Sequence, residues 1–199
     1  MATTASICWD GINETKVSGF NYSPGTDPIN DPTNSFIDFA APGGNYSILD
    51  AFTYNSYAHY VNPYTSQSTP FASGIIALLK SIKTDLTASQ CYNILKNTAD
   101  KIGADSYISG WNRYLGYGRI NAYKALKYTL ENYGGTLAQT LTVPSGETWN
   151  FQPGVTVKFA NGASLIVNGT LNAVGSSTNK ITFTRSGSSG TWGGIKCYA

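Results

Sequence analysis

Charged side chains are scarce in this sequence. Asp, Glu, Lys and Arg make up 12% of the 199 residues, about half the usual share, and the formal net charge at pH 7 is +2. There is no run or stripe of Lys and Arg, which argues against a nucleic-acid partner. No apolar run approaches the ~20 residues that a membrane-spanning helix needs. We therefore expect neither nucleic-acid binding nor a membrane span.

Metal-binding side chains are equally rare. The three cysteines, Cys8, Cys91 and Cys197, lie far apart, and His59 is the single histidine. Zinc sites usually show closely spaced pairs of Cys or His, so a zinc site is not predicted. We interpret the cysteines as small buried hydrophobic residues. The apolar share of 41% is enough for a real core.

Both ends of the chain suggest that it is part of a larger protein. The opening "MATTASICWDGINE" has neither the basic nor the apolar region of a signal peptide. The closing "TWGGIKCYA" has the pattern of a strand that stops without a turn. We expect sequence to be missing on both sides.

The first two thirds of the chain combine short strands with helices. Up to about residue 60, short apolar runs alternate with turn clusters, and "FIDFAAP" has the pattern of a strand that ends at Pro42. A helix follows Ser66. A second is predicted after the capping box Thr87-x-x-Gln90, and a third from Asn121, ending at "YGGT". From Phe71 to Leu79 the first helix has almost no polar side chain, which predicts a helix buried in the middle of its domain.

From Leu137 onward the period changes to that of strands. Apolar and polar residues alternate, Gly and Asn mark the turns, and no helix intervenes. Short, self-similar strands favour the stacked turns of a β-solenoid, and a β-sandwich is the alternative. About two turns are present, so a solenoid would leave an open edge at its last turn.

Ser66 raises a functional question, because it stands where the apolar helix begins. It could simply cap the helix. It could also be a nucleophile, since the free N–H groups of a helix N-terminus favour the negative charge of an oxyanion.

The segment around this serine resembles the serine motif of the subtilisin-like serine peptidases, G-T-S-[MS]-[AS]-x-P-x-x-x-G. In "TSQSTPFASG" at 65–74, the motif residues match in order and spacing: Thr65, Ser66, Ser68, Pro70 and Gly74. "DFAAPGG" at 38–44 resembles the segment upstream of the serine. "NTADKIG" at 97–103 and "LGYGRINAYKAL" at 115–126 resemble the C-terminal helices, and the stretch 6–25 resembles a further family segment.

This resemblance implies an α/β fold in which a parallel sheet is flanked by helices and a buried helix carries the serine. It assigns residues 1–134 to the C-terminal part of a peptidase domain. Ser66 is then the nucleophile that attacks a polypeptide substrate, and its N–H helps to hold the oxyanion. Pro70 is expected in the first turn, where no helical hydrogen bond is lost. No cofactor is implied. Calcium is often structural in the family, but its ligands cannot be located here.

The triad partners of the family are not found. The family order is Asp, then His, then Ser, and neither upstream motif is present. Asp10 and His59 lack the surrounding motifs and cannot be assigned. The chain is therefore predicted to be inactive by itself, with the missing N-terminal half of the peptidase domain as its partner. Tyr64 replaces the usual Gly and Gln67 the usual Met or Ser, which favours a pseudo-peptidase as an alternative.

Residues 135–199 resemble the first turns of a right-handed parallel β-helix domain of the kind appended to secreted bacterial enzymes and surface proteins. Such modules bind glycans or act as spacers at a cell surface, so a surface or glycan-binding protein is a further alternative. The resemblance, together with the low charge, favours a secreted or cell-surface protein.

Overall fold

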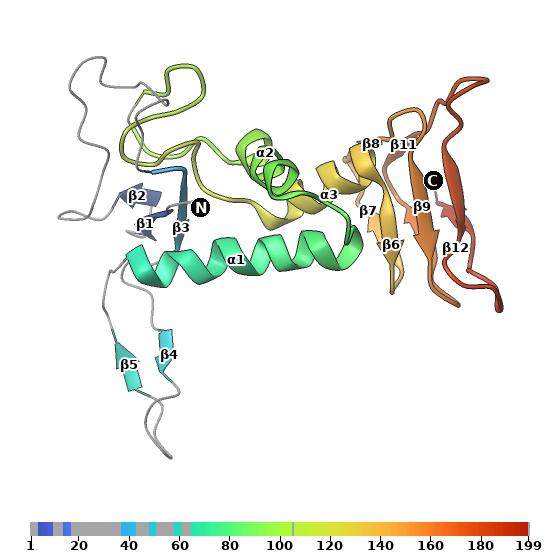
Figure 1. Cartoon of the computed structure of the whole chain (residues 1–199), viewed down its shortest axis with the longest axis horizontal. Coiled ribbons are helices and arrows are strands. Elements are labelled where there is room, and N and C mark those ends of the chain that lie inside the picture. Colours follow the sequence, from blue (N-terminus) through green and yellow to red (C-terminus); the bar gives the residue numbers. More distant parts are fainter. Residues whose placement is uncertain are drawn as a thin grey trace. The chain divides into compact units, whose positions relative to one another are not determined.

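The computed structural model describes most of the chain beyond residue 64 and shorter stretches before it. The described ranges are 4–9, 14–16, 37–42, 48–50, 58–60, 65–104 and 106–198. The chain divides into two compact units, residues 1–77 with 88–122 and residues 78–87 with 123–199. Figure 1 shows the elements along the chain. The expected boundary between residues 134 and 135 stays a prediction.

The first unit contains two small sheets. Strand β1 (Thr4–Trp9) pairs antiparallel with β2 (Glu14–Lys16) and parallel with β3 (Phe39–Pro42). Strands β4 (Ile48–Asp50) and β5 (Ala58–Tyr60) form an antiparallel pair. The strand predicted to end at Pro42 is confirmed as β3, whose first three residues are fully buried.

Helices α2 (Ala88–Thr98) and α3 (Ala122–Tyr133) confirm the predictions made from capping and periodicity. In α2, the stripe of Cys91, Ile94 and Leu95 is at most 3% exposed. The third helix ends at Gly134, as predicted, with a backbone φ of 70° that favours glycine. A Cβ there would lie 2.1 Å from the carbonyl oxygen of Thr156, so this turn also needs glycine for lack of space.

Helix α1 (Thr65–Ile82) corrects one prediction. It was expected to be buried on every side, but only Ser68, Ala72 and Leu79 on it are buried. Phe71 is 46% exposed and Leu78 is 48% exposed. A helix is buried all round only where neighbours cover every face, and the described elements cover one stripe of α1. Its apolar sequence therefore did not determine its burial.

The second unit contains eight short strands after α3. Their bounds are β6 (Gly135–Leu137), β7 (Leu141–Val143), β8 (Thr148–Asn150), β9 (Thr156–Phe159), β10 (Leu165–Val167), β11 (Thr170–Asn172), β12 (Thr182–Arg185) and β13 (Ile195–Cys197). They form three separate sheets with the orders β12-β9-β6, β13-β10-β7 and β11-β8. Every pair is parallel, which does not fit the antiparallel sheets of a β-sandwich.

The predicted alternation places one side of these strands in a common core. Val157 and Phe159 on β9 and Leu165 and Val167 on β10 are at most 4% exposed. Trp149 on β8 is 2% exposed and belongs to the same cluster. Parallel strands in the same register bring like residues side by side, so this core is built from columns of apolar side chains.

Candidate active site

Strand β3 provides a rigid floor for the site. Phe39, Ala40 and Ala41 are all 0% exposed. The strand pairs with β1 on one side. On its other side, the Ala40 N–H donates to the carbonyl of Gly118 at 2.8 Å, and the Ala40 carbonyl accepts from the N–H of Ile120 at 2.9 Å. A strand paired on both sides and buried on both faces holds its C-terminal end firmly in place.

Ser66 is the second residue of α1 and is exposed. The first N–H groups of an α-helix have no acceptor within the helix, and the helix dipole adds partial positive charge there. The first turn contains no acidic side chain that would neutralise this charge. The backbone around Ser66 is therefore suited to a developing oxyanion, and the exposed hydroxyl is open to a substrate.

Ser68 anchors this turn to the strand. Its hydroxyl donates a hydrogen bond of 3.1 Å to the carbonyl of Ala41, and the residue is 0% exposed. The bond joins the first turn of α1 to the end of β3 and so fixes the position of Ser66 two residues earlier. Sequence analysis used Ser68 only as a motif match. The signal that it had a structural role was a hydroxyl inside an otherwise apolar run.

Pro70 corrects a second prediction. It was expected in the first turn, but α1 begins at Thr65, so Pro70 is its sixth residue. Proline has no N–H, and the carbonyl of Ser66 therefore lacks its usual helical donor four residues on. The hydroxyl of Thr69 donates to the carbonyl of Thr65 at 3.2 Å, which adds a local bond to the same turn.

The structure brings no catalytic base to Ser66 within the part of the chain that it describes. No described side chain forms a hydrogen bond with its hydroxyl. His59 belongs to β5, where its backbone pairs with Leu49, but its side chain lies outside the described residues. Asp10 and Tyr64 lie outside them as well, as does the side chain of Gln67.

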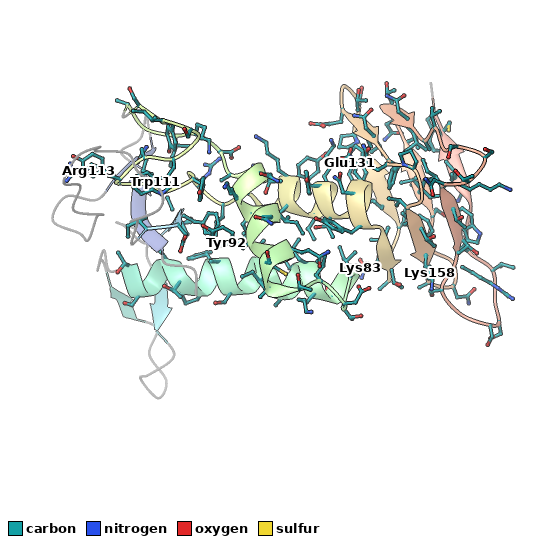
Figure 2. The ribbon with its side chains drawn as sticks, turned by 45° about the horizontal axis from the view of Figure 1, so that its top comes forward. Lys83, Tyr92, Trp111, Arg113, Glu131 and Lys158 are labelled. Atoms are coloured by element: carbon teal, nitrogen blue, oxygen red, sulfur yellow. The ribbon has the colours of Figure 1, made fainter. Side chains whose placement is uncertain are left out.

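A polar and aromatic cluster lies at the start of β3. The hydroxyl of Tyr92 donates to the carboxylate of Asp38 at 2.8 Å (Figure 2). Burial, with Asp38 next in importance, raises the pKa of Tyr92 well above its ordinary value. Phe39 and Tyr117 pack against Tyr92, with ring centroids 5.4 and 6.3 Å from it. The ammonium of Lys96 lies 4.5 Å from the centre of the Tyr117 ring. The cluster connects α2 to β3.

Lys101 ties the loop that follows α2 to this cluster. Its ammonium donates to the carbonyls of Gly110, at 2.7 Å, and Tyr117. Burial, with the nearby charge of Lys96 second, lowers the pKa of Lys101. Across the described residues, no group of three or more His, Cys, Asp or Glu side chains is placed to hold a metal ion. None of the described helices combines the length and apolar character of a membrane span.

The sequence profile of the Subtilase family (peptidase S8) matches residues 13–118, more than half of the chain. The chain belongs to the subtilase family. Thermitase from Thermoactinomyces vulgaris is 40% identical over 95 residues, which cover 47% of this chain and 29% of thermitase. The thermophilic serine proteinase of Bacillus sp. strain AK1 is 36% identical over 95 residues, 47% of this chain and 20% of that protein. This subtilase chain thus spans less than a third of either relative.

Among solved structures, fervidolysin from Fervidobacterium pennivorans, a keratinolytic enzyme, is 19% identical with a TM-score of 0.49; the match covers 72% of this chain and 21% of fervidolysin. MycP1 from the ESX-1 type VII secretion system is 29% identical with a TM-score of 0.44, covering 63% of this subtilase chain and 30% of MycP1.

Proposed function

We propose that this chain supplies the nucleophile, Ser66, of a serine endopeptidase that hydrolyses polypeptides. The observation that carries the proposal is the exposed serine at the start of α1, in a turn that Ser68 anchors to the buried strand β3. Family membership supports the reaction class. A serine that only capped the helix would not need a second serine to fix its turn.

The chemistry follows from the position of Ser66. Its Oγ attacks the scissile carbonyl while a base takes the hydroxyl proton, and the Ser66 N–H donates to the oxyanion that forms. The same base then gives the proton to the leaving amine. We propose that the histidine base and the carboxylate that orients it come from the N-terminal half of a peptidase domain whose C-terminal part is residues 1–134.

It follows that the 199-residue chain alone is inactive. Removing the base and its orienting group takes away most of the rate acceleration. A fluorogenic peptide incubated with the purified chain tests this, and we expect no turnover above that of the Ser66→Ala variant. Turnover that disappears in Ser66→Ala would show that the chain carries its own base.

The nucleophile itself is tested by fusion to the Asp- and His-bearing half of thermitase. A fluorophosphonate probe should label the fusion, and Ser66→Ala should abolish labelling. Ser81→Ala is the matched control, because Ser81 is an exposed serine of the same helix. A correctly folded fusion that does not label would favour the pseudo-peptidase, which the Tyr64 and Gln67 replacements also support.

We further propose that residues 135–199 begin a parallel β-solenoid domain. The three parallel sheets and their shared core support this architecture. In a secreted or cell-surface protein, such a domain would act as a spacer or bind glycans. A glycan array probed with the chain tests the second role, and binding that persists in Ser66→Ala would separate it from peptidase activity.

A further inference from the structure

One of the three sheets in the second unit is a strand shorter than the others. Along the chain, successive strands visit the three sheets in turn, from β6, β7 and β8 to β9, β10 and β11, and then to β12 and β13. The next place in this order is beside β11. No described strand occupies it, because β11 pairs only with β8 in the part of the chain that the structure describes. We call the outer edges of β11, β12 and β13 the open end.

Core residues at the open end are much less covered than their neighbours in the same columns. Leu165 is 1% exposed, whereas Ile195, its partner in register, is 40% exposed. Leu171 on β11 is half-buried, although its partner Trp149 is 2% exposed. Trp192 stacks on Phe159 with ring centroids 4.9 Å apart and so covers part of this end. The uncovered part lies at β11 and β13.

The opposite end of the same sheets is closed by α3. Leu130 of that helix is 2% exposed and belongs to the core of the strands. The carboxylate of Glu131 accepts a hydrogen bond of 2.7 Å from the N–H of Asn150 on β8, and its backbone carbonyl accepts from the N–H of Gln152 at 2.8 Å. Figure 2 marks Glu131 on α3. The outer edge of β8 is therefore capped and that of β11 is not.

The backbone of β11 is ready to pair with another strand. The N–H of Thr170 and the carbonyl of Asn172 bond toward β8, to Glu147 at 2.8 Å and Phe151 at 2.9 Å. Since successive residues of a strand present their backbone groups to opposite sides, the N–H and carbonyl of Leu171 face the vacant side. The amide of Asn172 also donates to the amide oxygen of Asn150 at 2.8 Å, which leaves its own oxygen as an acceptor for a further asparagine.

Charge indicates what kind of segment would fit. From residue 148 to the end of the chain there is no Asp or Glu, and Lys180, Arg185 and Lys196 lie in or next to the last strands. Two copies meeting at their open ends would bring like charges together, and lysine is a residue that discourages edge-to-edge pairing. Head-to-tail stacking of copies is blocked, because α3 covers the other end. An acidic segment would be attracted.

We propose that the open end is a strand-addition site for an extended, acidic segment of a separate polypeptide. The segment would lie parallel to β11 and continue its pattern of Thr, an apolar residue and Asn, which is "TWN" in β8 and "TLN" in β11. Backbone bonds would give affinity, and the apolar column and the asparagine ladder would give the register.

The probe is a fluorescein-labelled synthetic peptide, Glu-Thr-Leu-Asn-Val-Glu, titrated with the full 199-residue chain and followed by anisotropy. We expect saturable binding that weakens as salt is raised. By the pattern of β11, the Thr and Asn N–H groups of the peptide face the protein. N-methylation at Thr and Asn should therefore abolish binding, whereas N-methylation at Leu and Val should change it less than twofold.

On the protein side, Leu171→Ser should weaken binding at least fivefold. Leu78→Ser is the matched control, since Leu78 is an exposed leucine of α1, and it should leave binding unchanged. Three results would overturn the proposal: no saturation up to 1 mM chain, equal effects of the two N-methylated peptides, or a dimer by light scattering that the peptide does not dissociate. The last result would mean that a second copy occupies the open end.

Discussion

The hydroxyl of Ser68 and the carbonyl of Ala41 are 27 positions apart in the sequence and form a buried hydrogen bond of 3.1 Å. This bond joins the turn that carries Ser66 to the end of β3. The placement of the nucleophile thus depends on a neighbour that takes no part in the chemistry.

Replacing Ser68 with alanine should lower the free energy of unfolding by about 1–2 kcal/mol, because the Ala41 carbonyl loses a buried donor. Urea denaturation followed by tryptophan fluorescence measures the change. Ser81→Ala serves as the control, since the exposed Ser81 hydroxyl bonds only to its own helix, at Leu78, and should change stability by less than about 0.5 kcal/mol. Equal effects of the two substitutions would show that the bond to β3 contributes nothing.

Tyr92 should make the protein sensitive to alkaline pH. Its pKa is raised from the ordinary value of 10.0 in the folded state, so above about pH 10 the unfolded chain loses this proton first and stability falls as pH rises. Lys101, with a lowered pKa, contributes in the opposite direction but is common to both proteins compared. Unfolding free energies between pH 8 and 11 should decline less steeply in Tyr92→Phe than in the wild type.

For this pH series the control is Tyr198→Phe, because Tyr198 is 59% exposed. Its alkaline profile should follow the wild type. A Tyr92→Phe profile that also follows the wild type would contradict the assignment to Tyr92.

Gly116 should not tolerate a side chain. Its φ is 59°, and a Cβ there would lie 2.2 Å from the carbonyl oxygen of Asp38. We expect Gly116→Ala to destabilise the protein by about 2–4 kcal/mol, measured by urea denaturation. By contrast, Gly74 lies in α1 with no atom within 4 Å of the added Cβ, and Gly74→Ala should stabilise by about 0.5–1 kcal/mol. If both substitutions had the same sign, the close approach at Gly116 would be wrong.

Glu131 should be needed as an acceptor more than as a charge. Its carboxylate accepts from the N–H of Asn150 and pairs with Lys127 at 2.9 Å. Glu131→Ala leaves a part-buried N–H without its acceptor and should cost about 1–3 kcal/mol. Glu131→Gln keeps an oxygen there and should cost about 1 kcal/mol or less. Chemical denaturation of both variants tests this order, and an equal loss would assign the effect to charge.

Features encoded by neighbouring residues were predictable from the sequence. The capping box and the i, i+3, i+4 spacing of Cys91, Ile94 and Leu95 define α2 locally. The alternation in β9 and β10 is equally local, and it predicted which side chains form the core. Ser66 was found through a motif whose spacing is also local.

Features that depend on distant neighbours were not predictable. The burial of α1 depends on which elements cover it, and its apolar sequence gave the wrong answer for Phe71 and Leu78. The bond from Ser68 to Ala41 joins two elements whose contact no periodicity reveals. The cap on β8 likewise needs Glu131 and Asn150 to meet across 19 positions of sequence.

The proline at position 70 leaves an oxygen in the turn of Ser66 that can still accept a proton donor. Any protein segment that comes to enclose this turn would have to offer it an N–H, an O–H or a trapped water, since shutting in an unsatisfied carbonyl costs about 1–3 kcal/mol. The turn that presents the nucleophile thus also constrains what can be built over it.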